Sequence, residues 1–229
     1  DKFDKVINIW GADHHGYVAR LQAMGKALEA WNENQLIVII MQLVRLFRNG
    51  QEIKMSKRAG TYITLDELLE EISLDAARWF FLMRSPDTHM DFDLDLAKER
   101  SEKNPVYYAQ YAYARICSLL DKAEKEFNLD KTGIEFLKLL EQPAELALIK
   151  QLIRLPEIVE DIACDYQVQR LPQYVLDLVR AFHKFYEECQ VLNKKEEEKT
   201  QARLALCQAT KIVLKNAFDL MGISAPEKM

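Results

Sequence analysis

Apolar and polar residues follow two different patterns along this chain. In its first part, short apolar runs stand between turn signals: the run from Leu36 to Met41 is entirely apolar, and a second apolar stretch reaches Phe47 before the pair Asn49-Gly50. Apolar runs next to an Asn-Gly pair predict strands that end in a tight hairpin. Val6 to Trp10 predicts a further strand near the start of the chain.

From about Asp95 onward the apolar positions recur at helical spacing, and we expect no strand there. The last helix is expected from about Lys199 to Met221, where Gly222 ends it. Breaks between Phe127 and Gly133 and from Asn193 to Lys199 predict interhelical loops. The pattern indicates a bundle of five or six helices. Four prolines stand where the first turn of a helix tolerates them: Pro105, Pro143, Pro156 and Pro172.

Two helix-start signals lie between these parts. Thr64 and Glu67 have the spacing of a capping box and predict that a helix begins there. The segment Asp91-Phe92-Asp93-Leu94-Asp95 shares the start of a calcium loop, but Leu96 occupies the position where that loop needs glycine. We therefore interpret it as an alternating segment that ends with Asp95 capping the following helix and that connects the two parts.

Composition limits the classes of protein that remain. The chain has 229 residues, is 49% apolar and carries a net charge of −5. No run of 18 uncharged apolar residues occurs, so we expect a soluble globular protein of one to two domains without a membrane span. The acidic balance is an argument against a nucleic-acid partner, although a local basic patch can outweigh it.

Cysteine usage indicates a reducing compartment. The four cysteines lack C-x-x-C spacing, and each falls on a predicted helix. They are expected to be reduced core residues of a cytoplasmic protein and not zinc ligands or disulfides. They are Cys117, Cys164, Cys189 and Cys207.

The segment Lys54-Met55-Ser56-Lys57-Arg58 carries the chemistry most suggestive of a nucleotide site. It follows the predicted hairpin and precedes Gly60 and the capping box, so it is expected to be an exposed, bendable loop. Two ammonium groups, a guanidinium and a hydroxyl can gather around a polyphosphate. The alternative is a solvated basic turn without a ligand.

This segment resembles the KMSKS signature of class I aminoacyl-tRNA synthetases, with Arg58 where the last serine often stands. Essentially the whole chain resembles arginyl-tRNA synthetases, in the order of that family's motifs. The matching segments are Ile9 to Leu21, Asp75 to Leu82, Asn104 to Arg115 and Gly222 to Met229. The family's H-I-G-H signature does not occur, and we interpret the chain as the C-terminal part of a longer enzyme.

The resemblance implies a fold and a reaction. Residues 1–94 would be the C-terminal part of a doubly wound, Rossmann-type nucleotide-binding catalytic domain in an α/β fold. Residues 95–229 would be an all-α helical bundle of the DALR type that binds the tRNA anticodon. The parent enzyme would join arginine to its tRNA with ATP and Mg²⁺, as a monomer in the cytoplasm. The fragment alone is expected to be inactive.

The resemblance also implies roles for particular residues. Lys54 and Lys57 would stabilise the departing pyrophosphate, assisted by Ser56 and Arg58. His14 would lie near the arginine substrate. Gly11, Asp13, His15 and Met55 would belong to the ATP and arginine pocket, where parallel strands end and α/β sheets bind ligands. The alternative for His14 and His15 is a pair of scaffold residues.

Aromatic residues crowd the start of one predicted helix. Tyr107 and Tyr111 share a face at i, i+4 spacing, whereas Tyr108 points elsewhere. Unpaired bases stack on such rings, and the resemblance implies that Tyr111, Tyr186 and Met229 contact the anticodon. The alternatives are that these tyrosines pack in the core and that Met229 belongs to a disordered tail.

Three other functions stay open. A cysteinyl-type synthetase shares the KMSK loop but reads its substrate with zinc, for which no ligand cluster is apparent. The chain could act only as a tRNA-binding module. A helical interaction protein with an accidental K-M-S-K string is the third alternative.

Overall fold

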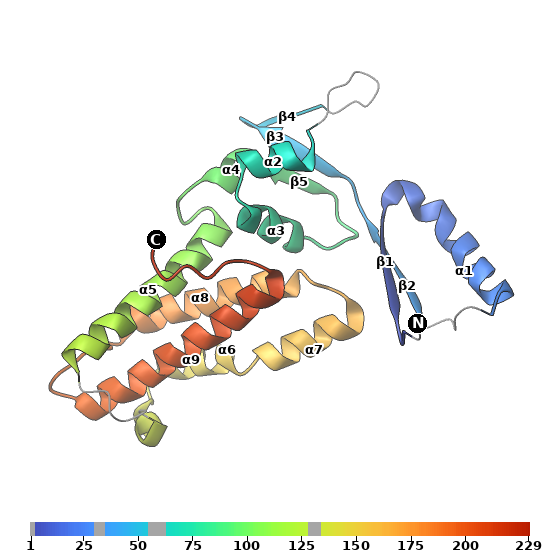
Figure 1. Cartoon of the computed structure of the whole chain (residues 1–229). Helices are drawn as coiled ribbons and strands as arrows, with labels where there is room; N and C mark the ends of the chain where they lie inside the picture. The colour runs from blue at the N-terminus through green and yellow to red at the C-terminus, as the bar shows by residue number, and fades with distance from the viewer. Residues whose placement is uncertain (1–2, 30–34, 55–62, 128–133) are drawn as a thin grey trace. The chain divides into compact units, whose positions relative to one another are not determined.

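The computed structural model describes residues 3–29, 35–54, 63–127 and 134–229 (Figure 1). Contacts divide the chain into two compact units. The mixed unit comprises residues 1–63 and 84–95, and the helical unit comprises residues 64–83 and 96–229. The division has three boundaries and not the single one expected near residue 94. Residues 64–83 belong to the helical unit because one of their helices packs on three helices of the bundle.

The first sheet of the mixed unit has two parallel strands, β1 (Val6–Gly11) and β2 (Leu36–Met41). Val6 pairs with Leu36 and Gly11 pairs with Met41, so both strands end at the same edge. Between them run the 3₁₀ helix η1 (Ala12–Tyr17) and the helix α1 (Val18–Ala27). Both predicted strands are confirmed. Two strands among the described residues are too few to identify a doubly wound sheet.

The second sheet contains the predicted hairpin. Strands β3 (Val44–Arg48), β4 (Gln51–Glu52) and β5 (Met90–Asp93) lie in the order β4-β3-β5. Asn49 and Gly50 both have positive φ, 50° and 70°, as a two-residue type I′ turn requires.

The cap of the next helix differs from the prediction. Helix α4 (Leu94–Lys98) begins one residue before Asp95. The carboxylate of Asp93 accepts the Asp95 N–H at 2.9 Å and therefore caps the helix. The prediction of Asp95 as the cap was wrong because its own carboxylate turns to the hairpin, where it accepts the Asn49 N–H at 2.5 Å.

Two short helices open the helical unit, α2 (Leu65–Glu71) and α3 (Leu74–Leu82). The capping box at α2 is confirmed: Thr64 Oγ1 accepts the Glu67 N–H at 3.2 Å, and Glu67 Oε2 accepts the Thr64 N–H at 2.7 Å. The backbone hydrogen bond from Thr64 lowers the pKa of Glu67, because it favours the ionised carboxylate.

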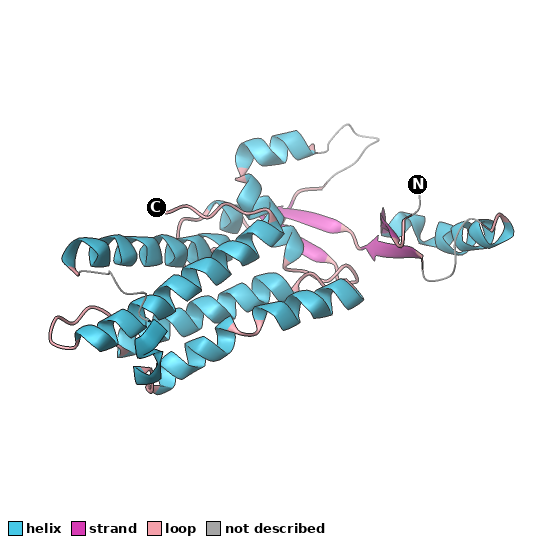
Figure 2. Ribbon diagram, turned by 60° about the horizontal axis from the view of Figure 1, so that its bottom comes forward, coloured by secondary structure: helices cyan, strands magenta, loops and turns pink. Residues whose placement is uncertain are grey.

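The rest of the helical unit is the expected bundle (Figure 2). Its elements are α5 (Pro105–Glu126), the 3₁₀ helix η2 (Ile134–Leu139), α6 (Pro143–Leu152), α7 (Leu155–Asp165), α8 (Arg170–Glu188) and α9 (Glu197–Met221). The prolines lie within the first turns of α5, α6, α7 and α8. Helix α9 begins two residues earlier than predicted, inside the segment expected to be a loop. Gly222 ends it with a φ of 66°.

Large apolar side chains fill the core of the bundle. Phe182, Phe185 and Phe218 are completely buried. Three of the four cysteines join this core, and burial raises the pKa of the Cys207 thiol to about 12. Cys164 is exposed, so the prediction of four core cysteines was wrong at this position. Cys189 follows α8 as its C-terminal cap and does not lie within a helix.

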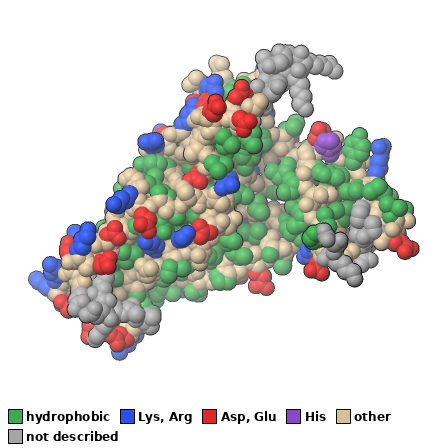
Figure 3. Space-filling model, in the orientation of Figure 1, with side chains coloured by type: hydrophobic (Ala, Val, Ile, Leu, Met, Phe, Trp, Pro, Cys, Tyr) green, Lys and Arg blue, Asp and Glu red, His purple; other side chains and the backbone are tan. Residues whose placement is uncertain are grey.

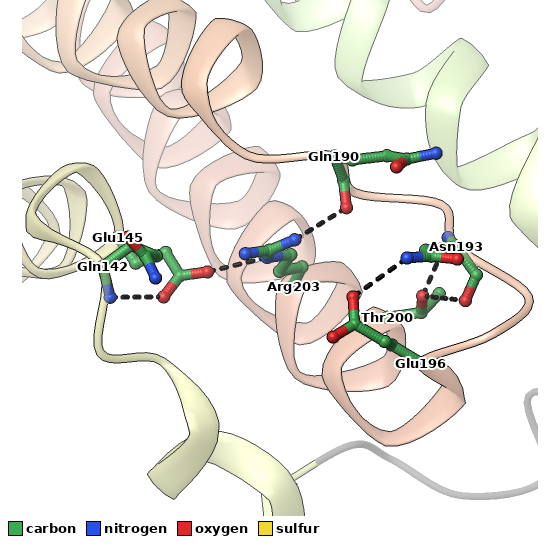
Figure 4. A network of polar contacts seen from close by, with 7 residues as sticks. All are labelled: Gln142, Glu145, Gln190, Asn193, Glu196, Thr200 and Arg203. Carbon is green, nitrogen blue, oxygen red and sulfur yellow. Dashed lines mark hydrogen bonds and ion pairs between the residues drawn. The ribbon is translucent and has the colours of Figure 1, made fainter.

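A buried ion pair ties α6 to α9 (Figure 4). Arg203 Nε lies 2.7 Å from Glu145 Oε1, and the Glu145 side chain is completely buried. Arg203 also donates to the Gln190 carbonyl oxygen at 2.8 Å, and Glu145 accepts the Gln142 N–H at 2.9 Å. Beside them, the Thr200 hydroxyl bonds to the backbone of Asn193 at 3.0 Å. These contacts set where α8 ends and α9 begins.

Charged side chains are mixed over the helical unit. On the face seen in Figure 3, lysines and arginines alternate with aspartates and glutamates and do not form one continuous basic field. Among the described residues, no helix has the length and apolar character needed to cross a bilayer.

Candidate functional site

The first candidate site begins where β1 ends. Gly11 is the last residue of the strand, and Asp13 and His14 follow on η1. Asp13 Oδ2 lies 3.6 Å from His14 Nε2, and both side chains are more than half exposed. A Cβ atom at Gly11 would stand 2.7 Å from Asp13 Oδ1, so glycine lets this carboxylate turn back over the strand end.

A hollow of about 620 Å³ lies beside this strand end. The His14 ring stands between two aromatic rings, with centroids 6.5 Å from Trp10 and 6.0 Å from Tyr17. The Arg20 guanidinium carbon lies 5.4 Å from the centre of the Tyr17 ring. Leu21 and Met24 complete the lining. Such a hollow can take a flat heterocycle against its rings and an anion at its guanidinium.

The structure brings only some of the predicted residues into this hollow. His14 lines it, whereas Gly11, Asp13 and His15 do not. Sequence reasoning did not single out Trp10, Tyr17 and Arg20, although all three lie in the Ile9–Leu21 segment that carries the family resemblance. The signal that could have found the last two is their helical spacing with Leu21 and Met24, which places the four on one side of the chain after His14.

The predicted phosphate loop lies mostly outside the described residues. Lys54 is described and exposed, two residues after the end of β4. Met55, Ser56, Lys57 and Arg58 lie outside the described residues. Their roles stay predictions.

The second candidate site lies at the start of α5. Asn104 is buried and caps this helix, because its Oδ1 accepts the Val106 N–H at 3.2 Å. Its amide nitrogen donates to the carbonyl oxygens of Ala97 and Glu99. This cap fixes the first turn, which carries Tyr107. The Tyr111 ring, one turn further on, stacks on Tyr107 with centroids 6.3 Å apart and planes 12° apart. The predicted shared face is confirmed.

One turn further along α5, Arg115 continues the same face toward α8. Its guanidinium carbon lies 4.4 Å from the centre of the Tyr186 ring. Tyr111 is 44% exposed, so its ring is available to a ligand. We call Tyr107, Tyr111, Arg115 and Tyr186 the aromatic row. Planar rings and a guanidinium plane in such a row are surfaces on which nucleobases stack.

The other two tyrosines of α5 serve packing. Tyr113 is 2% exposed and lies edge-on to Phe218 with centroids 6.1 Å apart. The Tyr108 hydroxyl lies 3.0 Å from His183 Nδ1 and so joins α5 to α8. The alternative of core packing therefore holds for Tyr113.

His183 lies next to the aromatic row. Its Nε2 is buried and finds no hydrogen-bond partner in the described structure. Burial, and to a smaller degree the neighbouring Arg115 guanidinium, lowers the pKa of His183. Burial raises the pKa of Tyr108. The pair is therefore neutral near pH 7 and supports the row without adding charge to it.

Met229 lies at the edge of a third feature, a hollow of about 510 Å³ in the helical unit. Tyr107 and Gln110 from α5 line the same hollow, together with Lys98 and Arg100 from the segment before α5. The terminal segment is held against the bundle, since Glu227 pairs with Lys211 at 3.1 Å. The alternative of a disordered tail was wrong. The lining combines a ring, a thioether, and both basic and acidic side chains, with Lys98 paired to Glu71 at 2.6 Å.

Metal ligands do not gather in the described part of the chain, where no cluster of three or more His, Cys, Asp or Glu side chains occurs. The Asp91–Asp95 segment forms the end of β5 and the start of α4, as the interpretation of an alternating segment expected.

The family of the DALR anticodon binding domain matches residues 109–229. The arginine–tRNA ligase of Carboxydothermus hydrogenoformans is 52% identical over 228 residues, which cover 99% of this chain and 41% of that protein. The arginine–tRNA ligase of Bacillus subtilis is 49% identical over 227 residues, with 99% and 40% covered. The chain thus spans about two fifths of the length of these relatives.

Solved structures agree with this match. An arginyl-tRNA synthetase structure from Campylobacter jejuni superposes with a TM-score of 0.84 at 35% identity, covering 98% of this chain and 48% of that one. The Thermus thermophilus arginyl-tRNA synthetase has a TM-score of 0.77 at 24% identity, and this second likeness concerns the fold alone.

Proposed function

The chain belongs to the arginyl-tRNA synthetase family, of which it matches the C-terminal portion, and we propose that its helical unit binds the anticodon of an arginine tRNA. The aromatic row is the observation that carries this proposal. It presents the exposed Tyr111 ring stacked on Tyr107, and the Arg115 guanidinium over the Tyr186 ring of α8. Recognition would come from base stacking more than from phosphate contacts.

Each predicted anticodon contact has a distinct chemistry. Tyr111 offers an exposed ring face, and Tyr186 offers a ring already covered on one side by Arg115. Stacking on a base is worth about 1–3 kcal/mol per ring. Met229 offers a polarisable thioether in the hollow that Tyr107 also lines, where it can contact a base that enters the hollow.

We infer a catalytic contribution from residues 1–94, which we propose are part of a Rossmann-type domain. Lys54 and Lys57 would stabilise pyrophosphate as it leaves ATP, with Ser56 and Arg58 assisting. Mg²⁺ would arrive with the ATP phosphates. The Trp10–His14–Tyr17 hollow supports an adjacent site for adenine or arginine, near Gly11, Asp13 and His15. Met55 stays a proposed member of that pocket.

The whole enzyme of which this chain would be a part is proposed to form arginyl-adenylate from arginine and ATP and to transfer the arginyl group to its tRNA. We propose that residues 95–229 are its anticodon domain and that it works in the cytoplasm as a monomer. The chain alone is expected to bind tRNA without activating arginine, because it spans about two fifths of its relatives.

The test is the affinity of the 229-residue chain for an arginine tRNA transcript and for the same transcript with a replaced anticodon, across a salt series. We expect the cognate anticodon to bind at least about tenfold tighter, a difference of ~1.4 kcal/mol. Equal affinity for both transcripts would overturn the proposal.

A further inference from the structure

The segment after α9 is bound to the bundle by hydrogen bonds from α3. Arg78 on α3 donates a hydrogen bond to the Gly222 carbonyl oxygen. Ile223 then enters the core and is 3% exposed. The described segment after α9 is not helix or strand, but these contacts with the bundle fix its direction.

The next residue, Ser224, is held by two elements at once. Its N–H donates to Asp75 Oδ1 at 3.1 Å, and its hydroxyl donates to Asp75 Oδ2. Gln110 Nε2 lies 2.8 Å from Asp75 Oδ2 and 3.0 Å from the Ser224 carbonyl oxygen. We call Asp75, Arg78, Gln110 and Ser224 the tail latch. It joins α3, α5 and the terminal segment.

The latch limits where Met229 can lie. Met229 is the fifth residue after Ser224, so a tail free beyond Ser224 would reach at most about 17 Å. The Lys211–Glu227 pair also restrains the tail, and the Glu227 side chain in it is 69% exposed. Exposed pairs of this kind are weak and screened by salt. The latch is stronger because the Asp75 carboxylate accepts several hydrogen bonds at once.

The latch and the hollow share a residue. Gln110 lines the hollow together with Tyr107 and Met229, and its amide also holds Ser224. The side chain that restrains the tail therefore also forms part of the wall against which Met229 lies. A base that enters this hollow would meet Tyr107 and Met229 at a spacing set by the latch.

We propose that the tail latch is a positioning device for Met229, and that it contributes to discrimination among unpaired nucleobases at this hollow. The proposal rests on the anticodon role proposed above. A purely structural role fits less well, because Ser224 is exposed and its hydroxyl fills no space in the core. The folding of α9 is already secured by Ile223 and by the core residues before it.

The experiment compares Ser224→Ala, Ser224→Thr and the control Lys215→Ala, which removes an exposed i, i+4 pair with Asp219 on α9. Affinity is measured for the arginine tRNA transcript and for the transcript with a replaced anticodon. Ser224→Ala is expected to weaken cognate binding about fivefold and to leave binding of the replaced anticodon unchanged. Ser224→Thr, which keeps the hydroxyl, and Lys215→Ala are expected to bind as the parent does.

A double-mutant cycle with Met229→Ala separates positioning from a general loss. If the latch acts through Met229, Ser224→Ala has no further effect in the Met229→Ala background. Equal effects of Ser224→Ala in both backgrounds would overturn the proposal. A loss of thermal stability that accounts for the loss of binding would overturn it as well.

Hydrogen exchange without RNA tests the latch apart from the anticodon role. Ser224→Ala is expected to raise exchange at the amides of residues 223–229 and not within α9. Unchanged exchange would show that the hydroxyl does not restrain the tail. If the parent chain does not distinguish the two transcripts while Ser224→Ala raises exchange, the anticodon role fails and the latch remains a tail restraint without a role in specificity.

Discussion

The guanidinium carbon of Arg115 lies 4.4 Å from the centre of the Tyr186 ring and so joins α5 to α8 across the aromatic row. The Phe182 ring also lies beside Tyr186, with the two ring centroids 6.0 Å apart, so the Tyr186 ring is held by neighbours from both helices. A cation over a ring face is worth about 0.5–1 kcal/mol at an exposed site. The contact therefore orients Tyr186 more than it stabilises the bundle.

Two substitutions of Tyr186 are expected to distinguish the contribution of its ring face to tRNA affinity from that of its hydroxyl. Tyr186→Phe keeps the stacking surface and should bind the arginine tRNA transcript within about threefold of the parent chain. Tyr186→Leu removes the π face and should weaken binding about tenfold or more, since one stack is worth ~1–3 kcal/mol. Ile153→Ala, at an exposed position between α6 and α7, is the control. Equal affinities of the Leu and Phe variants would argue against stacking on this ring.

Because the Glu145–Arg203 pair is buried, a single substitution is expected to lower the free energy of unfolding much more than the substitution of both residues. Glu145→Leu leaves the Arg203 guanidinium unpaired in the core and should cost about 3–5 kcal/mol in the free energy of unfolding. Adding Arg203→Met should recover a large part of this loss, because no buried charge then remains. The double variant still lacks the capping contact to Gln142, worth about 1 kcal/mol.

Urea denaturation followed by circular dichroism measures these differences. Lys215→Ala, at an exposed pair on the same helix α9, should change the free energy of unfolding by less than about 0.5 kcal/mol. A double variant that is less stable than Glu145→Leu would show that Arg203 stabilises the bundle even without Glu145, for example through its hydrogen bond to the Gln190 carbonyl oxygen.

The lowered pKa of His183 predicts how the stability of the folded chain depends on pH. Burial and Arg115 lower its pKa in the folded chain below the ordinary value of 6.5, so the unfolded chain binds the additional proton first. Stability should therefore be complete above about pH 7 and should decrease as the pH falls through 6.5 toward the lower folded pKa. The charged groups acting on the ring are Arg115 on α5, Glu187 on α8 and Glu102 before α5.

Thermal melts between about pH 5.5 and 8 test this dependence, since histidine is the side chain that titrates there. His183→Gln removes the titrating ring and should flatten the dependence, whereas His89→Gln at an exposed position should leave it in place. A parent chain whose stability rises on acidification through this range would contradict the assignment.

The sequence predicted those parts of the fold that depend on neighbours along the chain. The Asn49-Gly50 hairpin, the Thr64–Glu67 capping box and the end of α9 at Gly222 each follow from residues within four positions of one another. The prediction that Asp95 caps α4 was wrong because its carboxylate accepts the N–H of Asn49, which lies 46 residues away in the sequence.

The candidate sites were predictable to the same degree. The stacking of Tyr107 on Tyr111 follows from helical spacing alone. The position of the terminal segment does not follow from such spacing. Ser224 is bound to Asp75 across 149 residues, and Gly222 is bound to Arg78 across 144. No local pattern carries information about such pairs, and a terminal methionine by itself is typical of a loose end.

Replacing Gly222 by alanine is expected to lower the free energy of unfolding for two separable reasons. Its φ of 66° is a left-handed conformation, which costs a residue with a Cβ atom about 1–2 kcal/mol. A Cβ atom would also stand 3.0 Å from Arg78 Nη1, so Gly222→Ala should push the Arg78 guanidinium from the tail. The measurement is urea denaturation of Gly222→Ala in the parent chain and in an Arg78→Ala background. The cost should be smaller in the second background, where only the backbone conformation opposes alanine. Equal costs would mean that the guanidinium moves aside freely, and the hydrogen bond from Arg78 to Gly222 would then contribute little to holding the terminal segment.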